Sequence, residues 1–181
     1  TMRTSMLLTT IAFCLTMGCS IANKVKKLEG EEYDHYMALR VYLDQANARG
    51  QREKTERKEF FKNKTREDRD QWLKDKGLWD KFYQYEPHIR EKIVGGNVQV
   101  GWDKHMVYQS WGLPFLRRKL PGRQAQRSEM FVYRFEERED GVHQVWVKGS
   151  KDTYKAQRLY TKELIIDDDK VTEMREREGV W

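Results

Sequence analysis

Cysteine is scarce in this chain of 181 residues, because Cys14 and Cys19 are the only two and both lie close to its start. Cys14 falls inside an apolar stretch that we expect to be removed by proteolysis, which would leave Cys19 without a thiol partner. A fold held together by disulfide bonds is therefore not expected.

The sequence also lacks an apolar run of the length that spans a bilayer. Its most apolar stretch, residues 6–17, is interrupted only by threonines and follows a single positive charge at Arg3. A transmembrane helix needs about 20 apolar residues, whereas about a dozen that end in small residues are typical of the core of a signal peptide. We therefore expect residues 1–18 to be a cleaved export signal.

Recognisable catalytic and metal-binding patterns are missing as well. No serine lies in a nucleophile elbow, and no glycine-rich phosphate loop follows a predicted strand. Asp103 and His105 occupy alternate positions of a predicted helix, so they do not face each other as an acid–base pair would. No metal-ligand spacing connects the histidines, which are His35, His88, His105 and His143. The sequence predicts no enzyme activity, no cofactor and no metal site.

Charge is plentiful but mixed in sign. Between Lys24 and Lys92 there are 18 basic and 15 acidic residues, and the formal net charge of the whole chain is +6. A phosphate-binding face normally needs clustered basic residues without interspersed acids. A nucleic-acid partner is therefore not expected, whereas attraction to anionic lipid or to envelope polymers is compatible with this balance.

The segment around the second cysteine resembles the lipobox of bacterial lipoproteins. It reads L-T-M-G-C over residues 15–19, with a small residue directly before Cys19. The resemblance implies that Cys19 is diacylated and becomes the new N-terminus, so that the chain sits on a membrane without spanning it. Ser20 follows the acylated residue, and by the same resemblance a serine there permits transfer to the outer membrane, facing the periplasm.

Two regions are expected to follow the anchor. Residues 19–32 are polar and lack a periodic apolar face, which suits a tether. Residues 33–92 are expected to form one or two charged helices. The first has an apolar face and ends near Gly50, and Pro87 limits the last. The apolar positions of the first helix are Tyr36, Leu39, Leu43 and Ala46, and those of the later part are Trp72, Leu73, Leu78, Trp79, Phe82, Tyr83 and Tyr85.

The second half has the pattern of one helix followed by strands. Asp103 is expected to cap a helix over residues 104–110, which ends at Gly112 with Pro114 beyond it. Phe131, Tyr133 and Phe135 alternate on one face of a predicted strand. Two hairpins are expected, one over residues 130–147 and one over residues 159–174. The run Asp167 to Asp169 is interpreted as the turn of the second hairpin rather than as a metal site.

These residues carry a resemblance to the SmpA/OmlA domain. The run from Val100 to Pro114 reads V-G-W-D-K-x-x-V-x-x-x-W-G-x-P, and Leu164 to Val171 contributes L-x-I-D-x-x-K-V. The similarity covers roughly residues 93–178. The family includes the small lipoprotein subunit of the outer-membrane β-barrel assembly machinery. Membership implies a helix packed on an antiparallel sheet of three strands, and it places a domain at residues 93–181.

The sequence thus predicts an α+β protein, in which charged helices precede a small two-layer domain of a helix packed on an antiparallel sheet. Its expected role is that of a scaffold or assembly subunit that meets an envelope protein, and anionic lipid, at the outer membrane. An envelope-polymer binding module or a hydrolase without recognisable motifs is the alternative. The resemblance suggests the contact residues, unless they are ordinary surface charge: Trp102, Lys104, Arg117, Arg118 and Lys119.

Overall fold

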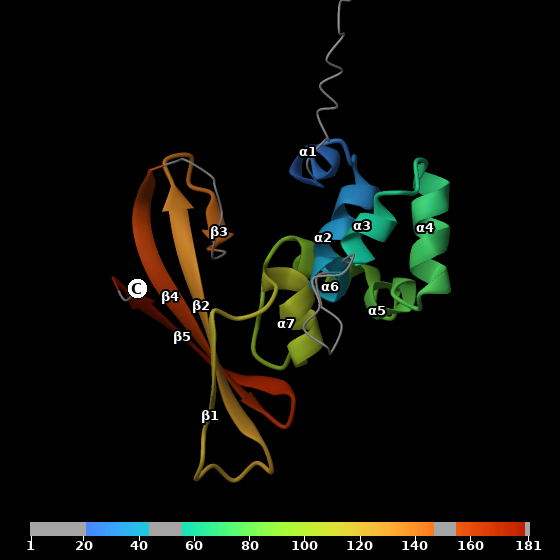
Figure 1. The fold of residues 1–181 in the computed structure, drawn as a ribbon. Coiled ribbons are helices and arrows are strands. Elements are labelled where there is room, and N and C mark those ends of the chain that lie inside the picture. The colour runs from blue at the N-terminus through green and yellow to red at the C-terminus, as the bar shows by residue number, and fades with distance from the viewer. Residues whose placement is uncertain (1–20, 44–55, 147–154, 180–181) are drawn as a thin grey trace, which may run out of the picture.

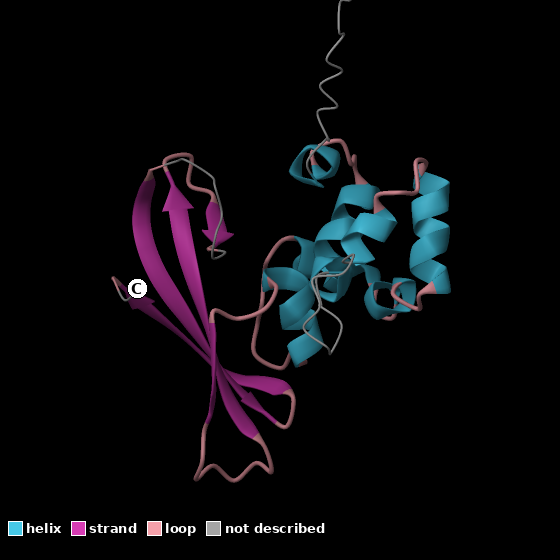
Figure 2. Ribbon diagram, in the orientation of Figure 1, coloured by secondary structure: helices cyan, strands magenta, loops and turns pink. Residues whose placement is uncertain are grey.

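The computed structural model describes residues 21–43, 56–146 and 155–179. Within these residues, seven helices precede five strands (Figures 1 and 2), which confirms the predicted α+β class. The helices are α1 (Ile21–Val25), α2 (Glu31–Leu43), α3 (Glu56–Phe60), α4 (Arg66–Asp75), α5 (Trp79–Tyr83), α6 (Pro87–Val94) and α7 (Lys104–Trp111). The strands are β1 (Leu116–Lys119), β2 (Ser128–Arg138), β3 (His143–Val145), β4 (Ala156–Asp167) and β5 (Lys170–Glu178).

The five strands form one antiparallel sheet with the order β1-β2-β4-β5. β3 also pairs with β2, but at a different place: β1 lies beside residues 129–132 of β2, and β3 lies beside residues 135–137. Both expected hairpins are present, as β2–β3 and β4–β5. Asp168 and Asp169 have φ angles of 46° and 70°, which a two-residue hairpin turn requires. The aspartate run is therefore a turn, as predicted.

Helix α7 begins and ends where the sequence predicted. The side chain of Asp103 accepts hydrogen bonds from the backbone N–H groups of His105 and Met106, at 2.7 and 3.0 Å. These bonds satisfy two of the donors that the first turn of a helix leaves without partners. At the other end Gly112 has a φ of 79°, which stops the helix.

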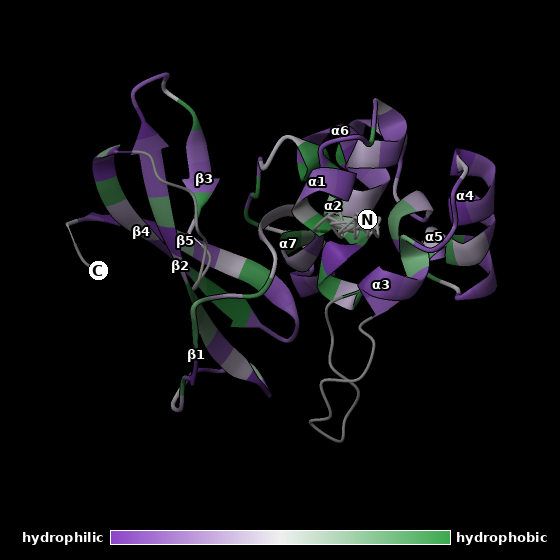
Figure 3. Ribbon diagram, turned by 45° about the horizontal axis from the view of Figure 1, so that its top comes forward, coloured by the Kyte–Doolittle hydropathy of each residue, from purple (hydrophilic) through white to green (hydrophobic). Residues whose placement is uncertain are grey.

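Aromatic side chains join α7 to the sheet. Phe131, Tyr133 and Phe135 share one face of β2 and are buried, as expected from their alternation. The ring of Tyr108 stacks on Phe131 with 5.6 Å between centroids, and Trp111 meets Tyr133 edge-on at 5.2 Å. Hydrophobic residues gather on the part of the sheet beside α7 (Figure 3). The predicted two-layer packing of a helix on a sheet is therefore present.

The charged region of residues 33–92 is broken into more helices than expected. Its described part contains α2 to α6, because local signals end each helix after a few turns. Thr65 caps α4 by accepting a hydrogen bond from the backbone N–H of Asp68 at 3.1 Å, and Gly77, with a φ of 63°, separates α4 from α5. The expectation of one or two helices was wrong.

Pro87 begins a helix rather than ending one. It occupies the first turn of α6, where the missing N–H has no helical partner to lose. Helix α6 also crosses the expected domain border between residues 92 and 93. One cluster of buried side chains extends from Leu39 in α2 through Trp111 in α7 to Leu164 in β4. The helices and the sheet therefore share a continuous core.

The segment expected to be a tether is folded in its described part. Ile21 and Val25 of α1 pack against the core, and Leu28 is itself buried. Lys24 adds a hydrogen bond from its Nζ to the backbone carbonyl of Phe61 at 3.3 Å. The prediction of a tether over residues 19–32 is corrected, because these apolar side chains hold the segment from residue 21 onward against the helices.

Candidate binding groove

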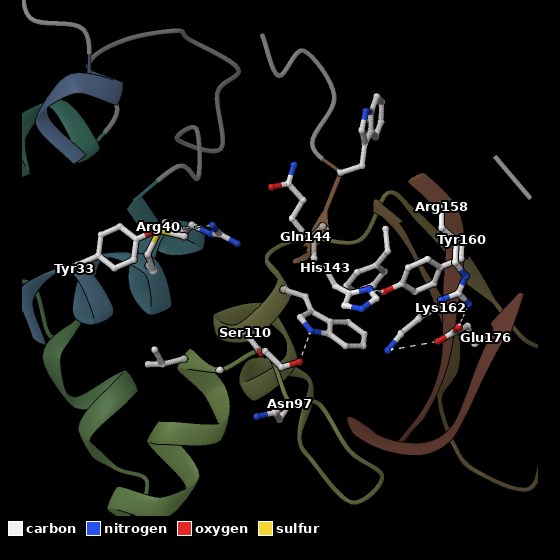
Figure 4. Close-up of a pocket in the computed structure, with 18 residues that line it drawn as sticks. Tyr33, Arg40, Asn97, Ser110, His143, Gln144, Arg158, Tyr160, Lys162 and Glu176 are labelled. Carbon is white, nitrogen blue, oxygen red and sulfur yellow. Dashed lines mark hydrogen bonds and ion pairs between the residues drawn. The ribbon is translucent and has the colours of Figure 1, made fainter. Parts of the chain in front are cut away.

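A groove with a volume of about 970 Å³ lies between the helices and the part of the sheet that α7 leaves open. Figure 4 shows Tyr33 and Arg40 on the helix side, opposite Arg158, Tyr160, Lys162 and Glu176 on the sheet side. The helical wall and floor are formed by Tyr33, Met37, Arg40, Val94, Gly95, Gly96, Asn97, Ser110 and Trp111. The sheet side, which includes its part of the floor, consists of Phe135, His143, Gln144, Val145, Trp146, Arg158, Tyr160, Lys162 and Glu176.

The floor of the groove is a rigid stack of aromatic rings. Trp111 donates a hydrogen bond from Nε1 to the backbone carbonyl of Gly96 at 2.9 Å, which fixes the indole. Its ring meets Phe135 edge-on at 5.0 Å between centroids, and Phe135 stacks on Tyr160 at 5.2 Å. Because these rings are nearly fully buried, they set the shape of the floor and leave ligand contact to the walls.

The sheet wall holds its cations in place with carboxylates. Arg158 forms ion pairs with Glu176 and Glu178, at 2.5 and 2.9 Å. The Nζ of Lys162 lies 3.7 Å from a carboxylate oxygen of Glu176 and 5.3 Å from the ring centroid of Phe135. The lining carries three cationic side chains and one carboxylate, but Glu137 and Glu178 beside the lining also pair with Arg158, so the charges at the groove balance.

A phenol and an imidazole meet at the β3 side of the groove. The hydroxyl of Tyr160 lies 2.8 Å from Nδ1 of His143, and this nitrogen is 4.0 Å from the nearest carboxylate oxygen of Glu137. Burial, and then the negative charge of Glu176, raise the pKa of Tyr160 above its ordinary value. The phenol therefore stays neutral at physiological pH and acts as a hydrogen-bonding group.

The rim of the groove exposes apolar side chains. Tyr33 and Val94 are each 41% exposed on the helix side, and Trp146 is half-buried on the side of β3. In the floor, Oγ of Ser110 is buried and has no hydrogen-bond partner within residues 21–43, 56–146 and 155–179. The groove thus combines an apolar rim with charged and polar side chains in its walls, and a concave surface with both kinds of group can bind another molecule.

A second and smaller hollow of about 430 Å³ is bordered by α2, α5 and α6. His35 lies in its wall, is almost fully buried, and is hydrogen bonded through Nε2 to the hydroxyl of Tyr83. Its other ring nitrogen faces a carboxylate oxygen of Asp70 at 3.8 Å, which is beyond hydrogen-bond distance. Burial lowers the pKa of His35, so the imidazole is neutral near pH 7.

The residues suggested by the sequence lie elsewhere. None of the five lines the groove: Trp102 and Lys104 lie before and at the start of α7, and the other three lie in β1. Trp102 is only 4% exposed and belongs to the core, and Lys104 is held in an ion pair with Asp169 at 2.7 Å. We therefore withdraw Trp102 and Lys104 as contact residues, because burial and pairing leave them little surface for a partner.

The other three suggested contact residues, Arg117, Arg118 and Lys119, lie in strand β1. Arg117 is paired with Glu129 on β2 at 2.7 Å, while Arg118 and Lys119 are exposed on β1. They give that edge of the sheet a positive charge. Cys19 and the expected signal at residues 1–18 lie outside the described residues.

The sequence reasoning missed the groove because its walls come from seven different elements. One signal was available: Tyr33 lies one turn before Tyr36 on the predicted helix but outside the apolar set that defined its buried face, and its side chain is exposed. In the described part of the chain no helix is long and apolar enough to cross a bilayer. The same part holds no group of three or more histidine, cysteine, aspartate or glutamate side chains that could bind a metal ion.

Comparisons with protein families, with curated proteins and with solved structures gave no match for this chain.

Proposed function

We propose that the protein is a lipid-anchored docking protein of the bacterial outer membrane, which faces the periplasm and binds an envelope protein in its groove. Its role is to hold or assemble that partner, and not to catalyse a reaction. The observation that carries this proposal is the groove itself, with exposed apolar side chains on its rim and paired charged groups in its sheet wall.

The position of α1 supports a short connection to the membrane. Only one residue separates Cys19 from Ile21, so an acyl group on Cys19 starts within about 7 Å of the folded body. A partner in the same membrane then meets the groove at a raised effective concentration, without any additional contact. This confinement is the mechanism that we propose for recruitment.

The resemblance to the SmpA/OmlA domain supports the same class of function. Helix α7 is capped by Asp103, is followed by the G-x-P residues 112–114, and packs on an antiparallel sheet. The resemblance implies work in an assembly of outer-membrane proteins, and we adopt it as part of the proposal. The identity of the partner is open to experiment.

Membrane retention and acylation test the proposal together. We expect the native protein to have the mass of a chain that begins at Cys19 and carries acyl groups, and to sediment with outer membranes. Cys19→Ala should release the folded protein into the soluble periplasmic fraction. A conservative exchange at the neighbouring residue, Ser20→Thr, serves as the control and should keep the acyl mass. A native protein without acyl mass, or an unchanged distribution of Cys19→Ala, would overturn the proposed anchor.

A further inference from the structure

We propose that α1 and the turn between α3 and α4 form a lysine surface that binds anionic phospholipid headgroups of the membrane in which the chain is anchored. The surface consists of Lys24, Lys26, Lys27 and Lys64. This inference rests on the proposed anchor at Cys19, and it adds which face of the protein lies against the bilayer. An acyl chain inserts into any bilayer, whereas lysines beside it are attracted only where the headgroups are anionic.

Two segments that are distant in the sequence form this surface. Lys24 donates a hydrogen bond from Nζ to the backbone carbonyl of Phe61 at 3.3 Å, which places α1 beside the turn that follows α3. Arg66, at the start of α4, forms an ion pair at 2.8 Å with Glu31 at the start of α2. The turn is thereby held against both α1 and the beginning of α2. In Figure 1, α1 and the start of α4 lie at the same end of the helical part.

The lysines of this surface have no carboxylate partner in the described part of the chain. Lys26, Lys27 and Lys64 are exposed there and form no ion pair, and Lys24 is hydrogen bonded only to a neutral carbonyl. An ammonium group without a carboxylate partner keeps its full attraction for an anion outside the protein. These lysines therefore differ from the cations of the groove, which are held by carboxylates.

The acidic residues near the surface do not balance it. Residues 21–30 and 61–65 contain five basic side chains and one acidic residue, Glu29. One of the five, Lys62, is paired with Glu59 at 2.8 Å. The five basic side chains against these two carboxylates leave a surplus of three positive charges. Glu67 and Asp68, which come next in the chain, lie in the first turn of α4, where the N–H groups of the helix attract them.

The residues outside the described part do not supply the missing carboxylates either. Cys19 and Ser20, which precede α1 after the expected cleavage, carry no charge in the acylated chain. Residues 44–55, which precede α3, include three basic and two acidic residues, a net charge of +1. The positive charge of the surface is therefore a property of the whole mature chain at this place.

The position of the anchor decides what covers the surface. Ile21 begins α1 within about 7 Å of an acyl group on Cys19, so α1 starts at the headgroup layer. Anionic headgroups strengthen the binding of each nearby lysine about fivefold. Because the bilayer is within reach of these lysines as long as the chain is anchored, it is favoured over a soluble acidic partner, which has to arrive by diffusion.

This orientation also places one rim of the groove near the membrane. Tyr33 lies in the first turn of α2, which follows α1 after a short connection. With α1 on the headgroups, this rim stands close to the membrane surface, where a membrane-embedded partner exposes its periplasmic parts. The lysine surface therefore orients the groove for the docking function proposed above.

Amine labelling of the native acylated protein on vesicles tests this inference. The probes are vesicles of phosphatidylcholine, with and without about one third phosphatidylglycerol, and lysine acetylation is measured by mass spectrometry. We expect acetylation of Lys26, Lys27 and Lys64 to be at least about threefold slower on the anionic vesicles, and the difference to vanish in about 1 M salt. Lys74 and Lys119, which are exposed elsewhere, should react alike on both kinds of vesicle.

Two outcomes of the labelling would overturn the inference. Equal acetylation of every lysine on both kinds of vesicle would show that the acyl group holds the protein without the lysine surface. Slower acetylation at Lys119 instead would assign the membrane-facing side to β1.

Vesicle sedimentation of the Cys19→Ala protein measures the electrostatic part of binding by itself. Lys26→Gln combined with Lys27→Gln should weaken binding to the anionic vesicles about 10–25-fold. Lys74→Gln combined with Lys119→Gln removes the same charge from other exposed positions and should weaken it less than about twofold. Equal losses in the two double variants would show that only net charge matters. That result, or binding of the Cys19→Ala protein no stronger to anionic than to neutral vesicles, would overturn the inference.

The anchor and the lysine surface fail separately. A chain without acyl mass whose lysines are still protected on anionic vesicles would overturn the proposed anchor and leave the surface. An acylated chain that reacts equally on both kinds of vesicle would overturn the lysine surface alone.

Discussion

Nζ of Lys104 lies 2.7 Å from Oδ1 of Asp169, and this ion pair joins the first turn of α7 to the turn between β4 and β5. An isolated antiparallel β-bridge pairs the backbones of Asp103 and Lys170 next to this ion pair. Backbone and side chain thus attach the helix to the sheet at one place. The ion pair fixes the end of α7 opposite to the one that borders the groove.

Replacement of Lys104 should therefore destabilise the fold in a pH-dependent way. The Lys104 ammonium, followed by Arg127, holds the pKa of Asp169 below its usual range. The stabilisation is thus fully present above about pH 4 and is lost as pH falls through the lowered pKa of the folded state. We expect Lys104→Met to cost less than about 1 kcal/mol at pH 7, because the carboxylate is partly exposed.

Urea unfolding at pH 7 and pH 3 measures this difference. The gap between Lys104→Met and the unmodified protein should narrow at pH 3. Lys92→Met, on α6 and without an ion pair among the described residues, is the control and should change stability little. If the stability difference between Lys104→Met and the unmodified protein were larger at pH 3 than at pH 7, the stabilising role of the Lys104–Asp169 ion pair would be contradicted.

Gly112 should be intolerant of any side chain. Its φ of 79° and ψ of −159° lie in a region that only glycine occupies readily. A Cβ there would be 3.8 Å from the guanidinium of Arg40, an ordinary contact, so the cost arises from the backbone. Gly112→Ala should lower the free energy of unfolding by about 1–3 kcal/mol. Leu113→Ala, at an exposed neighbour, should change it by less than about 0.5 kcal/mol. Equal effects of the two would show that Gly112 carries no special constraint.

Buried His35 should make the protein less stable as pH falls from 7 to 5. Burial lowers its pKa, and of the charged groups near it Asp70, Glu31 and Asp34 oppose that shift while Arg66 adds to it. Between the folded pKa and about 6.5 the unfolded chain therefore binds the proton that the folded chain does not. Stability then decreases with acid in this window.

The midpoint of urea unfolding, followed from pH 7 to pH 5, tests this sign. His35→Gln should flatten the profile, whereas His88→Gln, at an exposed position on α6, should keep it. Persistence of the slope in His35→Gln would assign the pH dependence to other groups.

Local signals in the sequence predicted the parts of the fold that depend on neighbouring residues. Asp103 and Gly112 fix α7 through contacts a few residues away, and Phe131 and Tyr133 define a buried face by their alternation. The prediction that Pro87 limits a helix was wrong, because proline is also favoured in the first turn of a helix, where Pro87 lies in α6.

Features that depend on residues far apart in the chain could not be predicted from the sequence. β1 reads L-R-R-K, which has no apolar alternation, and it becomes a strand because residues 129–132 lie beside it. α1 has only five residues, too few for a periodic pattern, and it is held by contacts to distant residues, one of them to the backbone of Phe61. The groove brings Tyr33 opposite Tyr160, which are far apart in the chain, so no spacing pattern could indicate it.

Photo-crosslinking in intact cells tests the central claim that the groove docks an envelope protein. A photoreactive phenylalanine analogue replaces Tyr33 on the rim of the groove, and in a matched protein it replaces Glu67, which is exposed on α4 and away from the sheet (Figure 1). The account predicts one adduct of defined mass from position 33, containing a membrane protein of the envelope, and none from position 67. No adduct from position 33, or the same adducts from both positions, would contradict it.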